Sequence, residues 1–188
     1  MRRAVFLDRD GTLNVEAGYI TDPEEFRLYP WTAQAVRQIN QGGMLAIVVT
    51  NQSGIARGFY PESTVHAMHD KLQALLAAEG AHLDAIYYCP HHPTAGVNEF
   101  ALDCNCRKPK PGLLLEAAAR YGIDLRSSYM IGDKALDVQV GRAAGATAIL
   151  LRTGFGIGEI ARLGTEQIDA DRIADTLLDA VEWISRRE

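Results

Sequence analysis

The chain has 188 residues, 47% of them hydrophobic, and a formal net charge of −5. That length suits one globular domain, residues 1–188, which buries roughly two-thirds of the surface of the unfolded chain. The acidic balance excludes a basic surface for nucleic acid or for an anionic membrane, and the lack of a long apolar stretch predicts a cytoplasmic protein without a signal peptide or membrane span.

Short apolar runs alternate with amphipathic segments along the chain. In chain order, the expected elements are a strand at 4–7, a helix at 30–41, a strand at 45–49, a helix between Pro61 and Gly80, a strand at 86–88, a helix after Pro111, a strand at 129–131, a helix at 135–144, a strand at 148–151 and a C-terminal helix. The strand runs are apolar almost throughout, which is typical of strands buried on both faces of a parallel sheet. The alternation predicts a Rossmann-like, doubly wound α/β fold with right-handed crossovers.

Two of the helices rest on a spacing of apolar residues close to the helical period. The helix after Pro61 is expected to bury one face, formed by Val65, Met68, Leu72, Leu75 and Leu76. The C-terminal helix is expected to bury another, marked by Ile173, Leu177, Val181 and Ile184.

Two aspartates, Asp8 and Asp10, directly follow the first expected strand, with Gly11 after them. The carboxyl ends of parallel strands are where open α/β sheets bind their ligands. Two converging carboxylates repel each other unless a cation lies between them, and oxygen-only ligation suits Mg²⁺. Taken alone, the same pattern is equally typical of a turn, because Asp and Gly dominate turns.

Three further loops carry residue types that bind phosphate or metal. Thr50 ends the second expected strand and leads into a turn of hydroxyl and amide side chains that can cradle phosphate oxygens. Lys108 supplies a cation just before a helix start. Asp133 follows the fourth expected strand, with Asp137 four residues on, and can complete a metal site that the aspartate pair begins.

This ordered set resembles the four motifs of the haloacid dehalogenase-like (HAD) phosphohydrolases: Asp8-Arg9-Asp10-Gly11-Thr12, then Thr50, then Lys108, then Gly132-Asp133 with Asp137. The resemblance implies that Asp8 is a covalent nucleophile and that Asp10 is the general acid and base. It implies that Thr50 and Lys108 stabilise the transferring phosphoryl group. It also implies a magnesium site formed by Asp8, Asp10 and Asp133.

All three cysteines lie close together in the sequence, and an odd number argues against a disulfide framework. The stretch offers four ligands for a tetrahedral zinc ion: Cys89, His91, Cys104 and Cys106. Four protein ligands leave no position for water, which is typical of a structural site. His92 is an alternative to His91, and buried cysteines without a metal are the plainer interpretation. A zinc-binding loop at about 89–106 would hold the residues that follow it, Lys108 included.

The cysteine loop narrows the resemblance. Together with the run from Thr50 to Gly58, it is similar to the family of bacterial D,D-heptose 1,7-bisphosphate 7-phosphatases. That family implies hydrolysis of the sugar's 7-phosphate through an aspartyl-phosphate intermediate. No large insertion follows the first expected strand or precedes Lys108, so a fold without a large cap domain is expected. The family also implies a substrate-binding set: Glu16, Ala17, Gly18, Tyr19, Asn51, Gln52, Ser53, Arg107 and Lys134. Arg107 is the first candidate for the distal phosphate and Arg57 the second, since arginine binds such groups bidentately.

Two other functions stay open on the sequence alone. Histidinol-phosphate phosphatases share the aspartates and the zinc loop, so a phosphatase for histidinol phosphate or another small phosphomonoester is the first alternative. A zinc-stabilised module that binds or processes nucleic acid is the second, and the acidic charge disfavours it. The expected partner is therefore a small sugar phosphate, and the expected state is a monomer.

Overall fold

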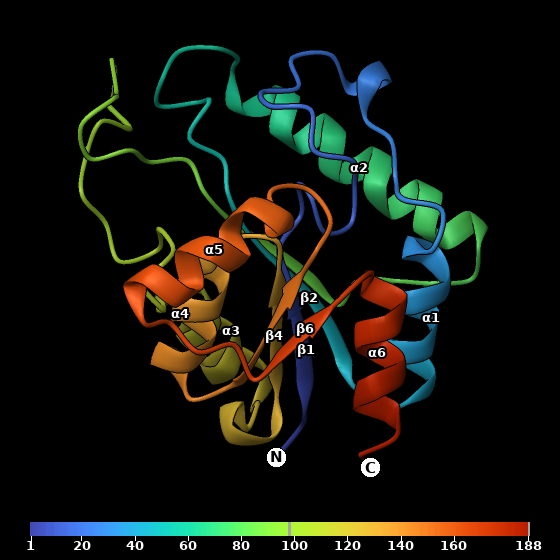
Figure 1. The fold of residues 1–188 in the computed structure, drawn as a ribbon. Coiled ribbons are helices and arrows are strands. Elements are labelled where there is room, and N and C mark those ends of the chain that lie inside the picture. The colour runs from blue at the N-terminus through green and yellow to red at the C-terminus, as the bar shows by residue number, and fades with distance from the viewer. Residues whose placement is uncertain (98, 188) are drawn as a thin grey trace.

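The computed structural model describes residues 1–97 and 99–187. In this part of the chain, parallel strands form one sheet in the order β3-β2-β1-β4-β5-β6 (Figure 1). The strands are β1 (Ala4–Leu7), β2 (Leu45–Asn51), β3 (Ala85–Cys89), β4 (Tyr129–Gly132), β5 (Thr147–Leu151) and β6 (Arg172–Ala174). The order reverses between β1 and β4, and this switch point is where doubly wound sheets place a ligand.

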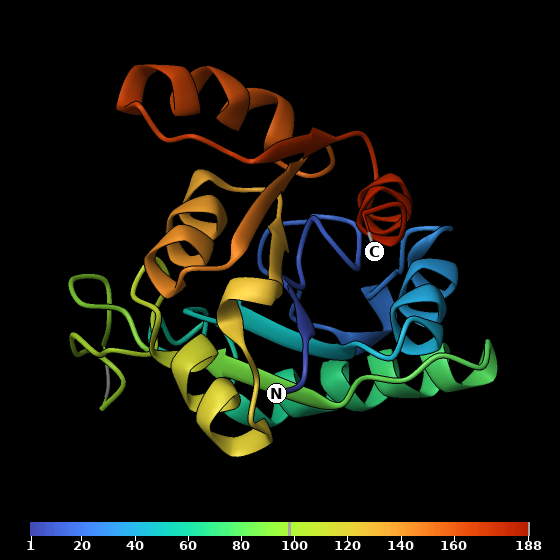
Figure 2. The same ribbon diagram turned by 90° about the horizontal axis from the view of Figure 1, so that it is seen from below.

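Helices cover both faces of the sheet (Figure 2). One face carries α1 (Thr32–Gln41), α2 (Glu62–Ala78) and α6 (Leu177–Ser185), and the other carries α3 (Gly112–Tyr121), α4 (Ala135–Ala144) and α5 (Gly156–Glu166). Two short 3₁₀ helices, η1 (Pro23–Glu25) and η2 (Leu125–Ser127), lie in connections. Each face of the sheet has its own hydrophobic core, and strand β1 contributes to both. Val5 and Leu7 pack on the side of α1, α2 and α6, while Ala4 and Phe6 pack on the side of α3 and α4.

The predicted doubly wound α/β sheet is confirmed, and three details of the prediction were wrong. Ile173 lies in strand β6, not in the C-terminal helix, which begins at Leu177. Helix α5 was not predicted. Leu75 was expected on the buried face of α2 but is 38% exposed. The buried face consists of Val65, Met68, His69, Leu72 and Leu76.

The connections leave the sheet's carboxyl edge open. Between β1 and α1, the only regular element among the described residues is η1, so no cap domain is inserted there. The loop from β3 to α3 (yellow-green at the left of Figure 1) has no helix or strand in its described part. Among the described residues, no helix has the length and apolar character needed to span a bilayer.

Candidate active site

The strand-end residues singled out in the sequence meet at one edge of the sheet. Asp8 follows β1, Thr50 lies near the end of β2, and Asp133 follows β4, and these three strands are neighbours. All three side chains are buried, as is that of Lys108. Charged groups are rarely buried without partners, so their contacts decide what this site can do.

Lys108 is the cation of the site. Its Nζ lies 3.0 Å from Asp8 Oδ1 and 2.6 Å from Asp137 Oδ1, and only 1% of its side chain is exposed. Burial would lower the pKa of Lys108, but the charges of Asp137 and Asp8 raise it overall, so the ammonium stays charged. The Asn51 side chain fixes the Lys108 backbone, donating to its carbonyl and accepting from its N–H.

Three carboxylates converge beside Lys108. Oxygens of Asp8, Asp133 and Asp137 lie within 4.8 Å of one another. Burial, together with the charges of Asp8 and Asp137, raises the pKa of Asp133 to about 8, although Lys134 opposes this. Asp133 Oδ1 has no hydrogen-bond partner in the described structure, and its nearest cation is Lys134 Nζ at 3.9 Å. This buried oxygen and the excess of negative charge fit a divalent cation.

Two glycines keep the space around Asp133 free. A Cβ on Gly11 or on Gly154 would lie 2.2 Å from Asp133 Oδ2, and both glycines have positive φ, 83° and 53°. Asp133 Oδ2 accepts from the backbone N–H of Phe155 at 2.8 Å, which leaves its other oxygen for the site. The loop after β5 therefore orients the Asp133 carboxylate, a contribution that the sequence interpretation missed.

The Asp10 carboxylate does not join this acid cluster. Arg9 Nη2 lies 2.9 Å from Asp10 Oδ2, Gln52 Nε2 donates to the same oxygen at 2.9 Å, and Asn14 Nδ2 donates to Oδ1 at 3.0 Å. Burial raises the pKa of Asp10, but the charge of Arg9 and these hydrogen bonds lower it overall. The structure thus separates the two carboxylates that the sequence pattern placed on one cation: Asp8 lies with Asp133, and Asp10 lies in a network with Arg9.

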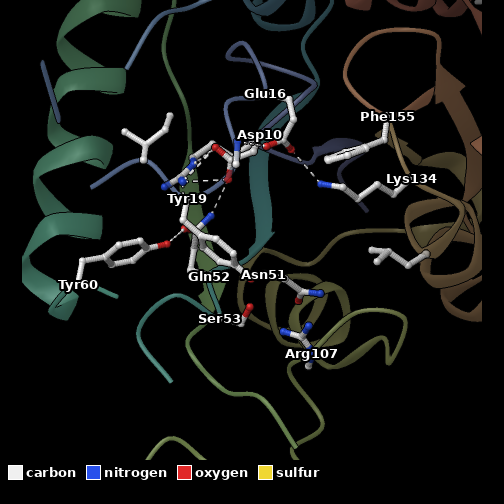
Figure 3. A pocket seen from close by; sticks show the side chains of 14 residues that line it. Asp10, Glu16, Tyr19, Asn51, Gln52, Ser53, Tyr60, Arg107, Lys134 and Phe155 are labelled. Atoms are coloured by element: carbon white, nitrogen blue, oxygen red, sulfur yellow. Dashed lines mark hydrogen bonds and ion pairs between the residues drawn. The ribbon is translucent and has the colours of Figure 1, made fainter. Parts of the chain in front are cut away.

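A pocket of about 320 Å³ adjoins the site at Asp10, Asn51 and Lys134 (Figure 3). Asp8, Thr50, Lys108 and Asp133 do not line it. It is lined by Arg9, Asp10, Glu16, Gly18, Tyr19, Ile20, Asn51, Gln52, Ser53, Tyr60, Arg107, Lys134, Leu136 and Phe155. The structure brings to this pocket every residue of the expected substrate-binding set except Ala17. Lys134 Nζ lies 3.2 Å from Glu16 Oε2, which links two walls of the pocket.

The four expected zinc ligands also lie together. The sulfur of Cys106 is 3.2 Å from those of Cys89 and Cys104, and 3.3 Å from His91 Nδ1. These sulfurs are too far apart for a disulfide, whose length is about 2 Å, and near the ~3.8 Å edge of a tetrahedral zinc–thiolate site. His92 lies outside the cluster, since its Nε2 is 3.1 Å from Arg57 Nη2. The donor set and its spacing fit a tetrahedral metal site with His91 as the fourth ligand.

Comparisons with known proteins show which family the chain belongs to. A HAD-hydrolase-like family model matches residues 105–180. A D-glycero-D-manno-heptose-1,7-bisphosphate 7-phosphatase from Thermosynechococcus vestitus is 47% identical over 187 residues, covering 97% of this chain and 95% of the relative. The D-glycero-beta-D-manno-heptose-1,7-bisphosphate 7-phosphatase of Escherichia coli K12 is 41% identical over 186 residues, covering 98% and 95%. The chain belongs to the heptose 1,7-bisphosphate 7-phosphatase family.

A solved structure extends the family likeness to the fold. The crystal structure of D,D-heptose 1,7-bisphosphate phosphatase from B. bronchiseptica, complexed with magnesium and phosphate, matches with a TM-score of 0.88 at 33% identity and covers 100% of both chains. The family resemblance drawn from the motifs is therefore confirmed.

In this family member the sequence interpretation missed several pocket residues. They are Arg9, Ile20, Tyr60, Leu136 and Phe155. A usable signal existed for Phe155 alone, because the Thr-Gly-Phe-Gly run follows a strand end as the other site loops do. Lys134 Nζ lies 4.8 Å from the centre of the Phe155 ring, so this side chain helps to hold a cation at the pocket wall.

His69 makes the stability of the protein depend on pH. Its side chain is 6% exposed, and burial followed by the charge of Arg9 lowers the pKa of His69 from 6.5 to about 3. The unfolded chain therefore binds a proton below pH 6.5 that the folded chain does not bind until about pH 3, so stability is lost as pH falls. From this group we expect a loss on the order of 2 kcal/mol between about pH 7 and about pH 4.5.

Urea unfolding of the wild type and of His69→Leu at both pH values measures this contribution. The variant should lack that part of the pH dependence, whereas His82→Leu, at an exposed position outside α2, should keep it. If the free energy of unfolding fell by the same amount between the two pH values in the wild type and in His69→Leu, the prediction would be contradicted.

Proposed function

We propose that this protein is a phosphoric monoester hydrolase that removes the 7-phosphate of D-glycero-D-manno-heptose 1,7-bisphosphate. The observation that carries the proposal is the buried Asp8–Lys108 pair, 3.0 Å apart, held next to a pocket of about 320 Å³ by Asn51, which lines the pocket and accepts from the Lys108 backbone N–H. A carboxylate beside a fixed cation suits attack on phosphorus, and a pocket of this size accommodates a sugar phosphate. The curated relatives, similar over nearly the whole chain, carry the name of this activity.

In the proposed mechanism, an Asp8 oxygen attacks phosphorus, and the bond from phosphorus to the sugar's C7 oxygen breaks. Arg9 lowers the pKa of Asp10, so this step requires that the negative charge of the bound phosphate raise that pKa again. Asp10 in its protonated form then gives its proton to the departing oxygen and becomes a carboxylate. Asp10 then takes a proton from water, which attacks the aspartyl phosphate and releases inorganic phosphate and free Asp8. Lys108 and the Thr50 hydroxyl stabilise the charge on the phosphoryl oxygens.

The acid cluster supports a magnesium ion held by Asp8 and Asp133. The unpartnered oxygen of Asp133 is the best available ligand for such a cation. Magnesium bound there supplies charge neutralisation of the phosphate oxygens and their alignment for in-line attack. The side chain of Asp10 stays with Arg9 in this arrangement, so we propose proton transfer, and not side-chain ligation, as its role.

The distal phosphate of the substrate is assigned to Arg107, and Lys134 is a second cation elsewhere in the pocket. Both line the pocket, and Arg107 Nη1 donates to the carbonyl of His91, which ties the guanidinium to the cysteine loop. Arg57, the second candidate in the sequence, does not line the pocket, and it contacts His92 instead. Arg107 is therefore the stronger assignment.

A substrate panel tests this function. We expect kcat/KM for heptose 1,7-bisphosphate to exceed that for histidinol phosphate by about 100-fold or more, because only the bisphosphate uses a second anion site. Arg107→Met should raise KM for the bisphosphate and leave hydrolysis of p-nitrophenyl phosphate unchanged. A preference for histidinol phosphate would overturn the substrate assignment while leaving the phosphatase chemistry in place.

We also propose that Cys89, His91, Cys104 and Cys106 hold a structural zinc ion, which fixes the loop that carries Arg107. Purified protein should contain about one equivalent of zinc, and its removal should lower the melting temperature and raise KM. Plasma emission spectroscopy and thermal melts measure both. Cys104→Ser should reproduce the effect, and less than about half an equivalent of zinc would count against the assignment. The expectations of a single domain and of a cytoplasmic monomer without nucleic-acid or membrane partners stay predictions.

A further inference from the structure

His69 is a buried polar group that the mechanism above does not use. It lies on α2, and its Nε2 is 3.3 Å from Arg9 Nη1. A guanidinium has only donors, so Nε2 must accept this hydrogen bond, and the ring proton lies on Nδ1. The ring of Tyr88 packs edge-on against His69, with centroids 5.5 Å apart, and restricts its rotation. His69 is thus a neutral acceptor aimed at one nitrogen of Arg9.

Arg9 uses its remaining donors on two other groups. Nε and Nη2 donate to both oxygens of Asp10, at 2.9 to 3.2 Å, and Nη2 also donates to Gln52 Oε1 at 3.0 Å. The side chain is 2% exposed, and its guanidinium carbon lies 5.7 Å from the ring of Phe26. The plane of the guanidinium is therefore set by His69 at one end and by Gln52 at the other. Together with the direct hydrogen bonds from Gln52 and Asn14, this plane sets where the Asp10 carboxylate lies.

Loss of the His69 acceptor would leave Nη1 of a buried guanidinium without that partner. Such a group is costly, so Arg9 would rotate to find another acceptor and the Asp10 carboxylate would move with it. Catalytic groups have to be held to well under an ångström, because small misplacements reduce rates by large factors. Arg9 lines the pocket but His69 does not, so His69 reaches the site only through Arg9.

We propose that His69 is a positioning residue that acts through Arg9 to hold Asp10 where it can protonate the departing sugar oxygen. This inference rests on the proposed role of Asp10 as the general acid. It adds a component of the active site that comes from helix α2, 60 residues away from Arg9 in the sequence. His69 itself touches neither substrate nor phosphate.

The test compares two leaving groups. A sugar alkoxide needs a proton to leave, whereas p-nitrophenolate is a weak base that leaves without one. The parameter kcat/KM covers the steps up to departure of the leaving group, so it reports on the acid and not on the later attack of water. We expect His69→Asn, whose amide is too short to reach Arg9, to lower kcat/KM for heptose 1,7-bisphosphate about 10- to 100-fold and that for p-nitrophenyl phosphate less than about twofold.

Three variants control this result. His69→Gln, whose longer amide carries an acceptor toward Arg9, should recover most of the activity on the sugar. Gln73→Leu, on the exposed side of α2 and one turn after His69, should behave as the wild type with both substrates. Asp10→Asn should show the same difference between leaving groups, but larger.

The outcomes distinguish the role of His69 from the role of Asp10. Equal losses with both substrates, no loss with either, or equal behaviour of His69→Asn and His69→Gln would overturn the inference while the role of Asp10 stands. If Asp10→Asn itself shows no difference between the leaving groups, the proposed general acid is wrong and the role of His69 falls with it.

Discussion

Asp8→Asn is expected to lower kcat by about 10⁴-fold or more, because an amide cannot form the covalent phosphoryl intermediate that a carboxylate forms. The fold should survive the change. Lys108 keeps its 2.6 Å contact with Asp137, so removal of the Asp8 charge does not leave the buried ammonium without a partner. The Asp8→Asn change also removes a negative charge that repels the Asp133 carboxylate.

The measurement is steady-state hydrolysis of heptose 1,7-bisphosphate, together with far-UV circular dichroism and a thermal melt. Mass spectrometry must show that the variant has not deamidated back to aspartate. Asp70→Asn, the same change at an exposed position on α2, should retain full activity. Turnover at the wild-type rate in a sample free of deamidation would end the assignment of Asp8 as nucleophile.

The convergence of the site on one edge of the sheet could be predicted from the sequence. Asp8, Thr50 and Asp133 each stand at the end of an apolar run, and parallel strands bring their carboxyl ends to the same side. The gathering of Cys89, His91, Cys104 and Cys106 could be predicted as well, because they lie in a loop without a core of its own. In both cases a local pattern and a general rule of topology were sufficient.

The direction of individual side chains could not be predicted in the same way. Asp10 lies away from the acid cluster and pairs with its buried neighbour Arg9, and Arg9 in turn contacts His69 of α2, from a distant part of the chain. From the sequence alone, an arginine in a short polar motif is expected to be exposed to solvent, because its contact with α2 is not visible there. Strand β6 was missed for a simpler reason: three residues are too few to show a period, and Ile173 falls at helical spacing from Leu177.

Lys108 is expected to contribute to both stability and catalysis. Lys108→Met removes the only cation within salt-bridge distance of the Asp8 carboxylate among the described residues, and it leaves Asp8 and Asp137 buried against each other. We expect kcat/KM to fall by about 10³-fold. We expect the free energy of unfolding to fall by about 3 kcal/mol in magnesium-free buffer, since breaking a buried ion pair leaves an uncompensated charge.

A second change separates the two effects. In Lys108→Met/Asp137→Asn the unpaired charge at position 137 is gone, while the amide oxygen can still accept from the Lys134 backbone N–H, as Asp137 Oδ2 does at 3.1 Å. Asp8 remains buried without its counter-ion, so the double variant should regain about half of the lost stability and none of the lost activity. Lys110→Met, whose ammonium pairs with Asp103 on the surface, should change neither quantity. If the double variant recovered activity together with stability, Lys108 would be a structural counter-ion only, and the phosphoryl group would have to be stabilised by the metal and Thr50 alone.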